Sequence, residues 1–353
     1  MSRFIALVLL LVFTTGLSAA EPWKFGVIPD TQWKNKADGY HGVAIHIIDA
    51  VNEELIRQKV DIVLHVGDVT DYATQPAFDV AAKHFKTLTE AGITFYPVRG
   101  NHDARGGAVT AEQFATAFPN LPGTPNGGGS SPDLPGMAGL TYSFVHKNAR
   151  FFMLDIFPVK GKDGEEVDYK PGDFQPWIDA ELAKKDFQHV FIASHKNLIG
   201  QRHKDNLFSS RTPNRYAEMQ NRFFKSFRDA GARIYLSGHD HMYYRARIRS
   251  VDRESELMQI ICGSCCHKFY EPQEPFSLRD IPSAQETGRV GFMVFTVDDD
   301  RVIGEYYSTK PFGDEPAQPK WSLRERFGYT KDGKYFEEQN VPMKDFLRYK
   351  LIP

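Results

Sequence analysis

The sequence predicts an α/β fold, and two features of the chain carry this prediction. Short apolar segments alternate with amphipathic segments of helical length between residues 24 and 237, the pattern of strands followed by helices. The composition, with 41% hydrophobic and 25% charged residues in a chain of 353, is that of a globular protein with a substantial core. No internal repeat or long block of like charge interrupts the pattern.

The first half of the alternation contains three predicted strands and two predicted helices. The strands are apolar runs at residues 24–28, 62–66 and 94–98. The helices repeat apolar residues at helical spacing and cover residues 43–58 and 77–91. Residues 105–139 then break the rhythm, because glycine and proline recur there. This stretch predicts a long surface loop around one short helix at 111–117.

The second half begins with a predicted hairpin and ends in β structure. The hairpin strands are 140–145 and 150–154. The helices and strands that continue the alternation are 175–184, 190–194, 216–230 and 234–237. The later strands are 244–251, 257–262, 291–297 and 302–308. No linker is evident, so we expect one domain of residues 21–310 with a C-terminal extension, 311–353, packed on it.

The first twenty residues differ in character from the rest of the chain. Arg3 precedes an almost unbroken apolar run at 4–13, and Ser18-Ala19-Ala20 places small residues before a cut after Ala20. This pattern is typical of a secretory signal peptide, and the run is shorter than the ~20 apolar residues of a membrane-spanning helix. We therefore expect cleavage, a secreted or periplasmic protein and no membrane span.

Net charge limits the classes of binding partner, and the cysteine content limits the possible cross-links. The formal net charge of −2 provides no basic excess for nucleic acid or an anionic membrane, so any affinity for phosphate must be local. Cys262, Cys265 and Cys266 lie too close together to cross-link distant parts of a fold. We interpret them as small apolar side chains at a buried strand rather than as a disulfide or a soft-metal site with His267.

Five short segments carry Asp, Asn and His where a predicted strand ends. They are Pro29-Asp30-Thr31-Gln32, Gly67-Asp68-Val69-Thr70-Asp71, Gly100-Asn101-His102-Asp103, Ser194-His195 and Gly238-His239-Asp240-His241. The carboxyl ends of strands in an open α/β sheet form the ligand crevice, so we expect these segments to converge. Carboxylate, amide oxygen and imidazole are ligands for Mn, Fe, Zn or Mg-like ions. The segments therefore predict a metal site.

Local details of the same segments suit two metal ions. His239 and His241 flank one residue, so in an extended segment both point to the same side. One bridging carboxylate can hold two ions about 3.5–4 Å apart, the spacing used for in-line phosphoryl displacement. Gly67, Gly100 and Gly238 precede the ligands, where we expect glycine to let the backbone turn sharply.

The five segments, in this order, resemble those of the calcineurin-like metallophosphoesterases from about residue 24 to residue 308. The resemblance implies a four-layer αββα double β-sandwich. The residues that it assigns to metal are Asp30 and His241 for a first ion, Asn101, His195 and His239 for a second, and Asp68 as the bridge between them.

The resemblance also implies how a phosphate ester is held and cleaved. Hydroxide activated by the two ions attacks phosphorus, and His102, oriented by Asp103 or by Asp71, protonates the leaving alkoxide. Lys196 and Arg202 follow a metal ligand in a polar loop that either contacts phosphate or is only solvated. The candidate substrate-binding residues are thus Asn101, His102, Lys196 and Arg202.

Gln32 departs from the usual family pattern, in which a histidine follows the first Asp by two residues. An amide oxygen coordinates metal more weakly than imidazole, and oxygen-rich ligand sets suit Mn- or Mg-like ions. We therefore expect Gln32 to be a weak ligand and Mn²⁺ to be the preferred ion; the alternative is that Gln32 only lines the pocket. The tyrosine ligand of the purple acid phosphatase branch is replaced by Asp71, so a purple iron centre is not expected.

The sequence thus predicts a metal-dependent phosphohydrolase that acts on phosphomonoesters or phosphodiesters. Its expected cofactors are two divalent metal ions, and its expected partner is a small phosphorylated ester or nucleotide. One alternative is a non-catalytic member of the same fold that binds metal or phosphate. Another is an exported nucleotide pyrophosphatase or cyclic phosphodiesterase, since some family members with such substrates also carry Asp-x-Gln.

Overall fold

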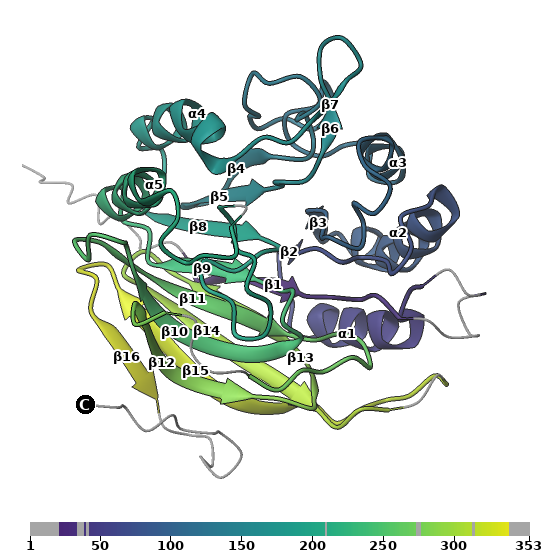
Figure 1. Cartoon of the computed structure of the whole chain (residues 1–353). Helices are drawn as coiled ribbons and strands as arrows, with labels where there is room; N and C mark the ends of the chain where they lie inside the picture. Colours follow the sequence, from purple (N-terminus) through teal and green to yellow (C-terminus); the bar gives the residue numbers. More distant parts are fainter. Residues whose placement is uncertain are drawn as a thin grey trace, which may run out of the picture.

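The structure is a computed structural model, and it describes residues 21–33, 39, 42–208, 210–272, 277–312 and 315–338. Two seven-stranded mixed sheets pack face to face, and helices cover the outer side of each (Figure 1). The expected four-layer αββα sandwich is confirmed. The expected signal peptide, residues 1–20, lies outside the described residues. Within those residues, no helix combines the length and apolar character that crossing a bilayer requires.

The first sheet has the strand order β16-β15-β14-β13-β1-β2-β3. Its parallel strands are β1 (Trp23–Ile28), β2 (Ile62–His65) and β3 (Thr94–Pro97). Its antiparallel strands are β13 (Val290–Val297), β14 (Arg301–Thr309), β15 (Ser322–Thr330) and β16 (Tyr335–Glu338). The helices on this side are α1 (Ile45–Arg57), α2 (Gln75–Glu90) and α3 (Val109–Ala117).

The second sheet has the order β12-β10-β11-β9-β8-β5-β4. In chain order its strands are β4 (Tyr142–His146), β5 (Ala149–Leu154), β8 (His189–Ser194), β9 (Ile234–Ser237), β10 (Met242–Arg249), β11 (Glu256–Gly263) and β12 (Asp280–Glu286). Its helices are α4 (Pro171–Ala183) and α5 (Ala217–Asp229), which lie side by side in Figure 1. A two-stranded ribbon is formed by β6 (Val159–Lys160) and β7 (Glu166–Val167).

Aromatic side chains join the two sheets at the centre of the core. The ring of Phe25, in β1, lies 5.2 Å from Phe151 and 4.8 Å from Phe191, which belong to the other sheet. Edge-to-face pairs of this kind add to the stabilisation from burying apolar area. On the opposite face of β1, a side chain at Gly26 would lie 2.8 Å from Leu55, so glycine lets α1 pack directly on the strand.

Part of the expected C-terminal extension, residues 322–338, forms β15 and β16, which continue the first sheet beyond β14. These strands were not predicted, because β15 is rich in charged residues. Its charges are paired: Arg326 Nη2 lies 2.5 Å from Glu305 Oε1 of the neighbouring β14, and Glu325 Oε1 lies 2.6 Å from Arg245 Nη2 of β10 in the other sheet. Paired charges on a sheet leave no apolar alternation in the sequence.

Candidate metal centre

The carboxyl ends of the central strands bring the five polar segments together between the two sheets. Asp30 follows β1 and Asp68 follows β2, and the two loops are joined by hydrogen bonds from Asp30 N–H to the Gly67 carbonyl and from Thr31 N–H to the Asp68 carbonyl. His195 follows β8 directly. The ligand atoms of Asp30, Asp68 and His195 all lie within 4.8 Å of one another, and the three side chains are buried.

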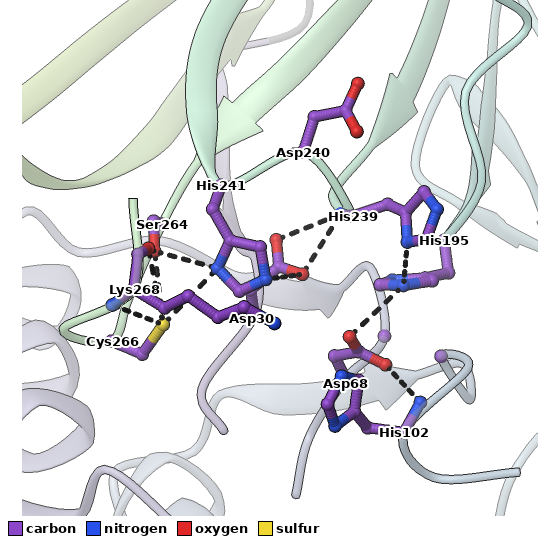
Figure 2. Close-up of polar contacts among 12 residues, drawn as sticks. Asp30, Asp68, His102, His195, His239, Asp240, His241, Ser264, Cys266 and Lys268 are labelled. Atoms are coloured by element: carbon purple, nitrogen blue, oxygen red, sulfur yellow. Dashed lines mark hydrogen bonds and ion pairs between the residues drawn. The ribbon is translucent and has the colours of Figure 1, made fainter. Parts of the chain in front are cut away.

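One half of the centre gathers around the Nε2 atom of His195. This nitrogen lies 2.9 Å from Asn101 Oδ1, 3.2 Å from His239 Nδ1 and 3.4 Å from Asp68 Oδ2. His195 Nδ1 faces the Val66 carbonyl oxygen at 3.0 Å, which directs Nε2 toward the other three atoms. Figure 2 shows His195 between His239 and Asp68. These donor atoms face one another closely, and their atom types are those of a divalent metal site.

The other half of the centre gathers around Asp30. Its carboxylate accepts hydrogen bonds from His239 N–H, and its Oδ1 lies 3.8 Å from His241 Nε2 (Figure 2). The Nδ1 atom of His241 lies 3.4 Å from both Ser264 Oγ and Cys266 Sγ. These two residues orient the histidine, a role that no motif in the sequence indicated. All three cysteines of the chain are buried and free.

The electrostatics of the centre favour bound positive charge. Burial raises the pKa of Asp30 to about 8, because desolvation disfavours an isolated carboxylate. Burial also opposes ionisation of Asp68, but the nearby His195 holds the pKa of that carboxyl well below its usual range. Desolvation opposes protonation of His195 as well, yet Asp68 raises the pKa of His195 to about 9. The Asp68 carboxylate thus favours a positive charge beside it, which a bound cation would also supply.

Several predicted ligands have an unusual, left-handed backbone conformation. Asp30, Asp68, His239 and His241 all have positive φ, at 45°, 54°, 73° and 47°, a conformation that non-glycine residues adopt at an energetic cost. We expected the sharp turns at the preceding glycines, but most of them lie at the ligands themselves. Gly100 instead leaves space, because a Cβ there would lie 2.2 Å from Asp68 N and Oδ1.

Gln32, the position that departs from the family pattern, is buried. Its backbone forms an isolated bridge with Val43, and its side chain is 2% exposed. Neither the oxygen nor the nitrogen of its amide has a hydrogen-bond partner in the described part of the chain. Buried amides are almost always hydrogen-bonded, so an orphaned one fits a side chain whose partner is a bound ion or its water.

His102 connects the centre to the cleft in front of it. Its N–H donates to Asp68 Oδ1 at 2.7 Å, its ring Nδ1 lies 2.7 Å from Asp71 Oδ1, and its ring Nε2 lies 2.9 Å from Arg105 Nη2. Asp103, the other predicted partner, faces away from the ring: its carboxylate accepts hydrogen bonds from the N–H groups of Gly100, Val69 and Thr70. Asp71 therefore orients His102, and Asp103 ties two site loops together.

A cleft of about 630 Å³ opens in front of the centre. Three of the four predicted substrate-binding residues line it, namely Asn101, His102 and Lys196. Arg202 is not among the described lining residues; its guanidinium lies over the ring of Tyr270, which does line the cleft. Further cationic lining comes from Arg105, Arg211 and Lys268.

Two aspartates that sequence patterns did not single out as site residues position the histidine segment. Asp205 Oδ1 lies 3.2 Å from His239 Nε2, which leaves the Nδ1 atom of that ring facing the centre. Carboxylates in this role fix the orientation and basicity of metal-binding histidines. Asp240 points away from the centre in Figure 2 and accepts hydrogen bonds from the N–H groups of residues 201–203, which hold the adjacent loop.

Comparison with known proteins shows which protein family has this arrangement. The family profile described as calcineurin-like phosphoesterase matches residues 24–243, more than half of the chain. The chain belongs to the calcineurin-like phosphoesterase family. Members of this family use a dinuclear metal centre, and the convergent donors around Asp30, Asp68 and His195 fit one.

Solved structures share the fold of this calcineurin-like phosphoesterase at low sequence identity. The structure of PhoD is 14% identical, with a TM-score of 0.63, and the match covers 92% of this chain and 73% of that one. Purple acid phosphatase PPD1 from yellow lupin (Lupinus luteus) seeds is 15% identical, with a TM-score of 0.57, and the match covers 82% of this chain and 52% of that one. No curated protein matches the chain.

Proposed function

We propose that the protein is a metal-dependent phosphohydrolase that cleaves phosphomonoesters or phosphodiesters. The observation that carries the proposal is the convergence of Asn101, His239 and Asp68 on His195 Nε2, next to a histidine that lines the cleft. A non-catalytic metal-binding member would not require His102 to be oriented by Asp71 toward that cleft. The geometry therefore favours catalysis.

The ions, when bound, supply Lewis acidity toward the phosphoryl oxygens and toward water. Asp30 and His241 would hold the first ion, Asn101, His195 and His239 the second, and Asp68 would bridge them. We propose Gln32 as a weak ligand of the first ion, and its orphaned amide supports this role. Oxygen donors favour Mn²⁺ there over Zn²⁺.

The chain's own acid is His102. Asp71 Oδ1 forms an ion-pair contact with the ring Nδ1 at 2.7 Å, and Nε2, which lies beside the cleft-lining Arg105, is the atom that would donate a proton to the leaving oxygen. The acid lies outside the set of metal-binding side chains, and binding and proton transfer are therefore separable by mutation. The apolar run at residues 4–13 supports export, so we propose that the enzyme acts outside the cytoplasm.

A metal-by-substrate assay tests the proposal. Purified protein is stripped with chelator, reloaded with Mn²⁺, Zn²⁺, Mg²⁺ or Fe²⁺, and assayed on p-nitrophenyl phosphate, its diester, a nucleotide pyrophosphate and a cyclic nucleotide. We expect turnover that disappears with chelator and returns most fully with Mn²⁺. Asp68→Asn should lose metal and turnover together, because a neutral amide does not balance two dications. Hydrolysis of none of the four substrates under any metal would refute the proposal.

A further inference from the structure

Arg105 is a cation of the cleft that the proposed chemistry leaves without a role. Its side chain is exposed and lines the cleft, and its Nη2 donates to His102 Nε2 at 2.9 Å. Lys196, on the opposite loop, is already paired with Asp205 at 3.0 Å. No carboxylate in the described parts of the chain forms an ion pair with Arg105. Its only side-chain hydrogen-bond partner in those parts is the Nε2 atom of the His102 imidazole.

The backbone of Arg105 is anchored close to His102. Ala104 N–H donates to the Gly100 carbonyl at 3.1 Å, and Arg105 N–H donates to the His102 carbonyl at 3.3 Å. On the far side of the turn, Ala108 N–H donates to Glu166 Oε2 at 2.8 Å. The guanidinium can therefore change partner by side-chain rotation alone, without any movement of the loop that carries His102.

A phosphoryl oxygen is a better partner for this guanidinium than the imidazole. A phosphate carries the charge opposite to the guanidinium and can accept two parallel hydrogen bonds from it, whereas the imidazole nitrogen accepts only one. We propose that Arg105 moves from His102 to the substrate phosphate on binding, and that it thereby selects phosphomonoesters over phosphodiesters. This inference rests on the proposed phosphohydrolase function and names its substrate class.

The chemistry of the two ester classes explains the selectivity. A phosphomonoester has three unesterified oxygens and up to two negative charges, whereas a phosphodiester has two such oxygens and one charge. Lys268 and Arg211 add positive charge to the same cleft, which further favours a dianion. Removing Arg105 should therefore weaken binding of the monoester more than binding of the diester.

The test compares Arg105→Gln and Arg105→Lys with Arg215→Gln, which changes an exposed arginine that does not line the cleft. The substrates are p-nitrophenyl phosphate and bis(p-nitrophenyl) phosphate, whose shared leaving group hardly needs a proton. For Arg105→Gln we expect the KM of the monoester to rise about 10- to 100-fold, the loss of a hydrogen bond to a charged group, with little change in kcat. The diester KM should change less than about threefold, and Arg105→Lys should be intermediate.

Titration with inorganic phosphate provides a readout that does not depend on turnover. Calorimetry should show phosphate affinity weakened by a similar factor in Arg105→Gln and unchanged in Arg215→Gln. Equal KM changes for both esters, or unchanged phosphate affinity, would overturn the proposal for Arg105. A wild-type protein that hydrolyses neither ester, nor the nucleotide pyrophosphate or the cyclic nucleotide, would instead refute the phosphohydrolase function, and the phosphate titration would still decide whether Arg105 binds phosphate.

Discussion

Asp155→Asn should destabilise the protein by about 3–5 kcal/mol, because it leaves a buried guanidinium without its counter-charge. Arg99 and Asp155 are both fully buried, and they form a two-pronged ion pair with Nε–Oδ2 and Nη2–Oδ1 distances of 2.7 and 3.1 Å. The asparagine has the same shape, so the change removes charge without creating a cavity. The full cost of an unpaired buried charge should therefore be visible in the free energy of unfolding.

The pair also holds the wall of the cleft. Arg99 Nη2 donates to the carbonyl oxygens of Phe157 and Pro158, each at 3.2 Å, and Asp155 Oδ1 accepts from Phe157 N–H at 2.9 Å. Arg99→Met should consequently cost more than Asp155→Asn, because it orphans two carbonyl acceptors, at about 1–3 kcal/mol each, as well as the carboxylate. The double variant should cost less than the sum of the two single variants, since neither charge then remains unpaired.

Urea unfolding of the three variants measures these free energies. The matched control is Asp179→Asn, whose carboxylate lies 2.8 Å from Arg222 Nη2 with the two side chains 35% and 61% exposed. Exposed pairs contribute about 0–1 kcal/mol, so this control should stay close to wild type. An Asp155→Asn protein no less stable than the control, or free energies that simply add in the double variant, would refute the reasoning.

Three further predictions concern single residues. His102→Ala should lower turnover about 10²–10⁴-fold for an alkyl phosphate but much less for p-nitrophenyl phosphate, with metal content unchanged; equal losses would assign His102 to binding. Gln32→His should tighten one metal site and shift its preference from Mn²⁺ toward Zn²⁺ in metal titrations, and curves identical to wild type would exclude Gln32 from the metal shell. Burial raises the pKa of Asp280 to about 6, so this group is protonated in the folded state at pH values where it is ionised in the unfolded chain. The stability that Asp280 contributes is therefore fully present below its unfolded pKa of 3.8 and is lost as pH rises through about 6. In Asp280→Asn, the free energy of unfolding measured in urea should depend less on pH over that window. The same pH dependence as in wild type would contradict the assignment.

The central strands could be predicted because of where they lie. Parallel strands buried on both faces, such as β1, β2 and β8, are apolar throughout and are recognisable in the sequence. The strand β12 was missed for the opposite reason. It lies at the edge of its sheet, where Pro282 is tolerated next to an irregularity in the pairing with β10. Neither alternation nor an apolar run marks such a strand.

In the candidate metal site, only the residues that follow strands could be predicted from the sequence. Its main donors follow strands directly, so their convergence could be expected from the α/β pattern alone. Asp205, Cys266 and Arg105 lie in loops, and their contacts with the site histidines depend on how those loops fold back. The choice between Asp71 and Asp103 as the partner of His102 was likewise open, because both follow candidate ligands by a few residues and only the folded structure shows their directions.

The glycines of the site show how the motifs depend on one another. A Cβ at Gly67 would lie 2.7 Å from the Cβ of His195, and one at Gly238 would lie 2.5 Å from Asp30 Oδ2. Each glycine therefore makes room for a donor from a different strand, not for the residue that follows it. The left-handed φ values fall mainly on the ligands, because the chain must turn each side chain back toward the centre within two to four residues of the strand end. In a short Gly-Asp or Gly-His pair, the glycine makes room for a donor from another segment, and the Asp or His is itself a donor. No single segment can therefore form the site without the others.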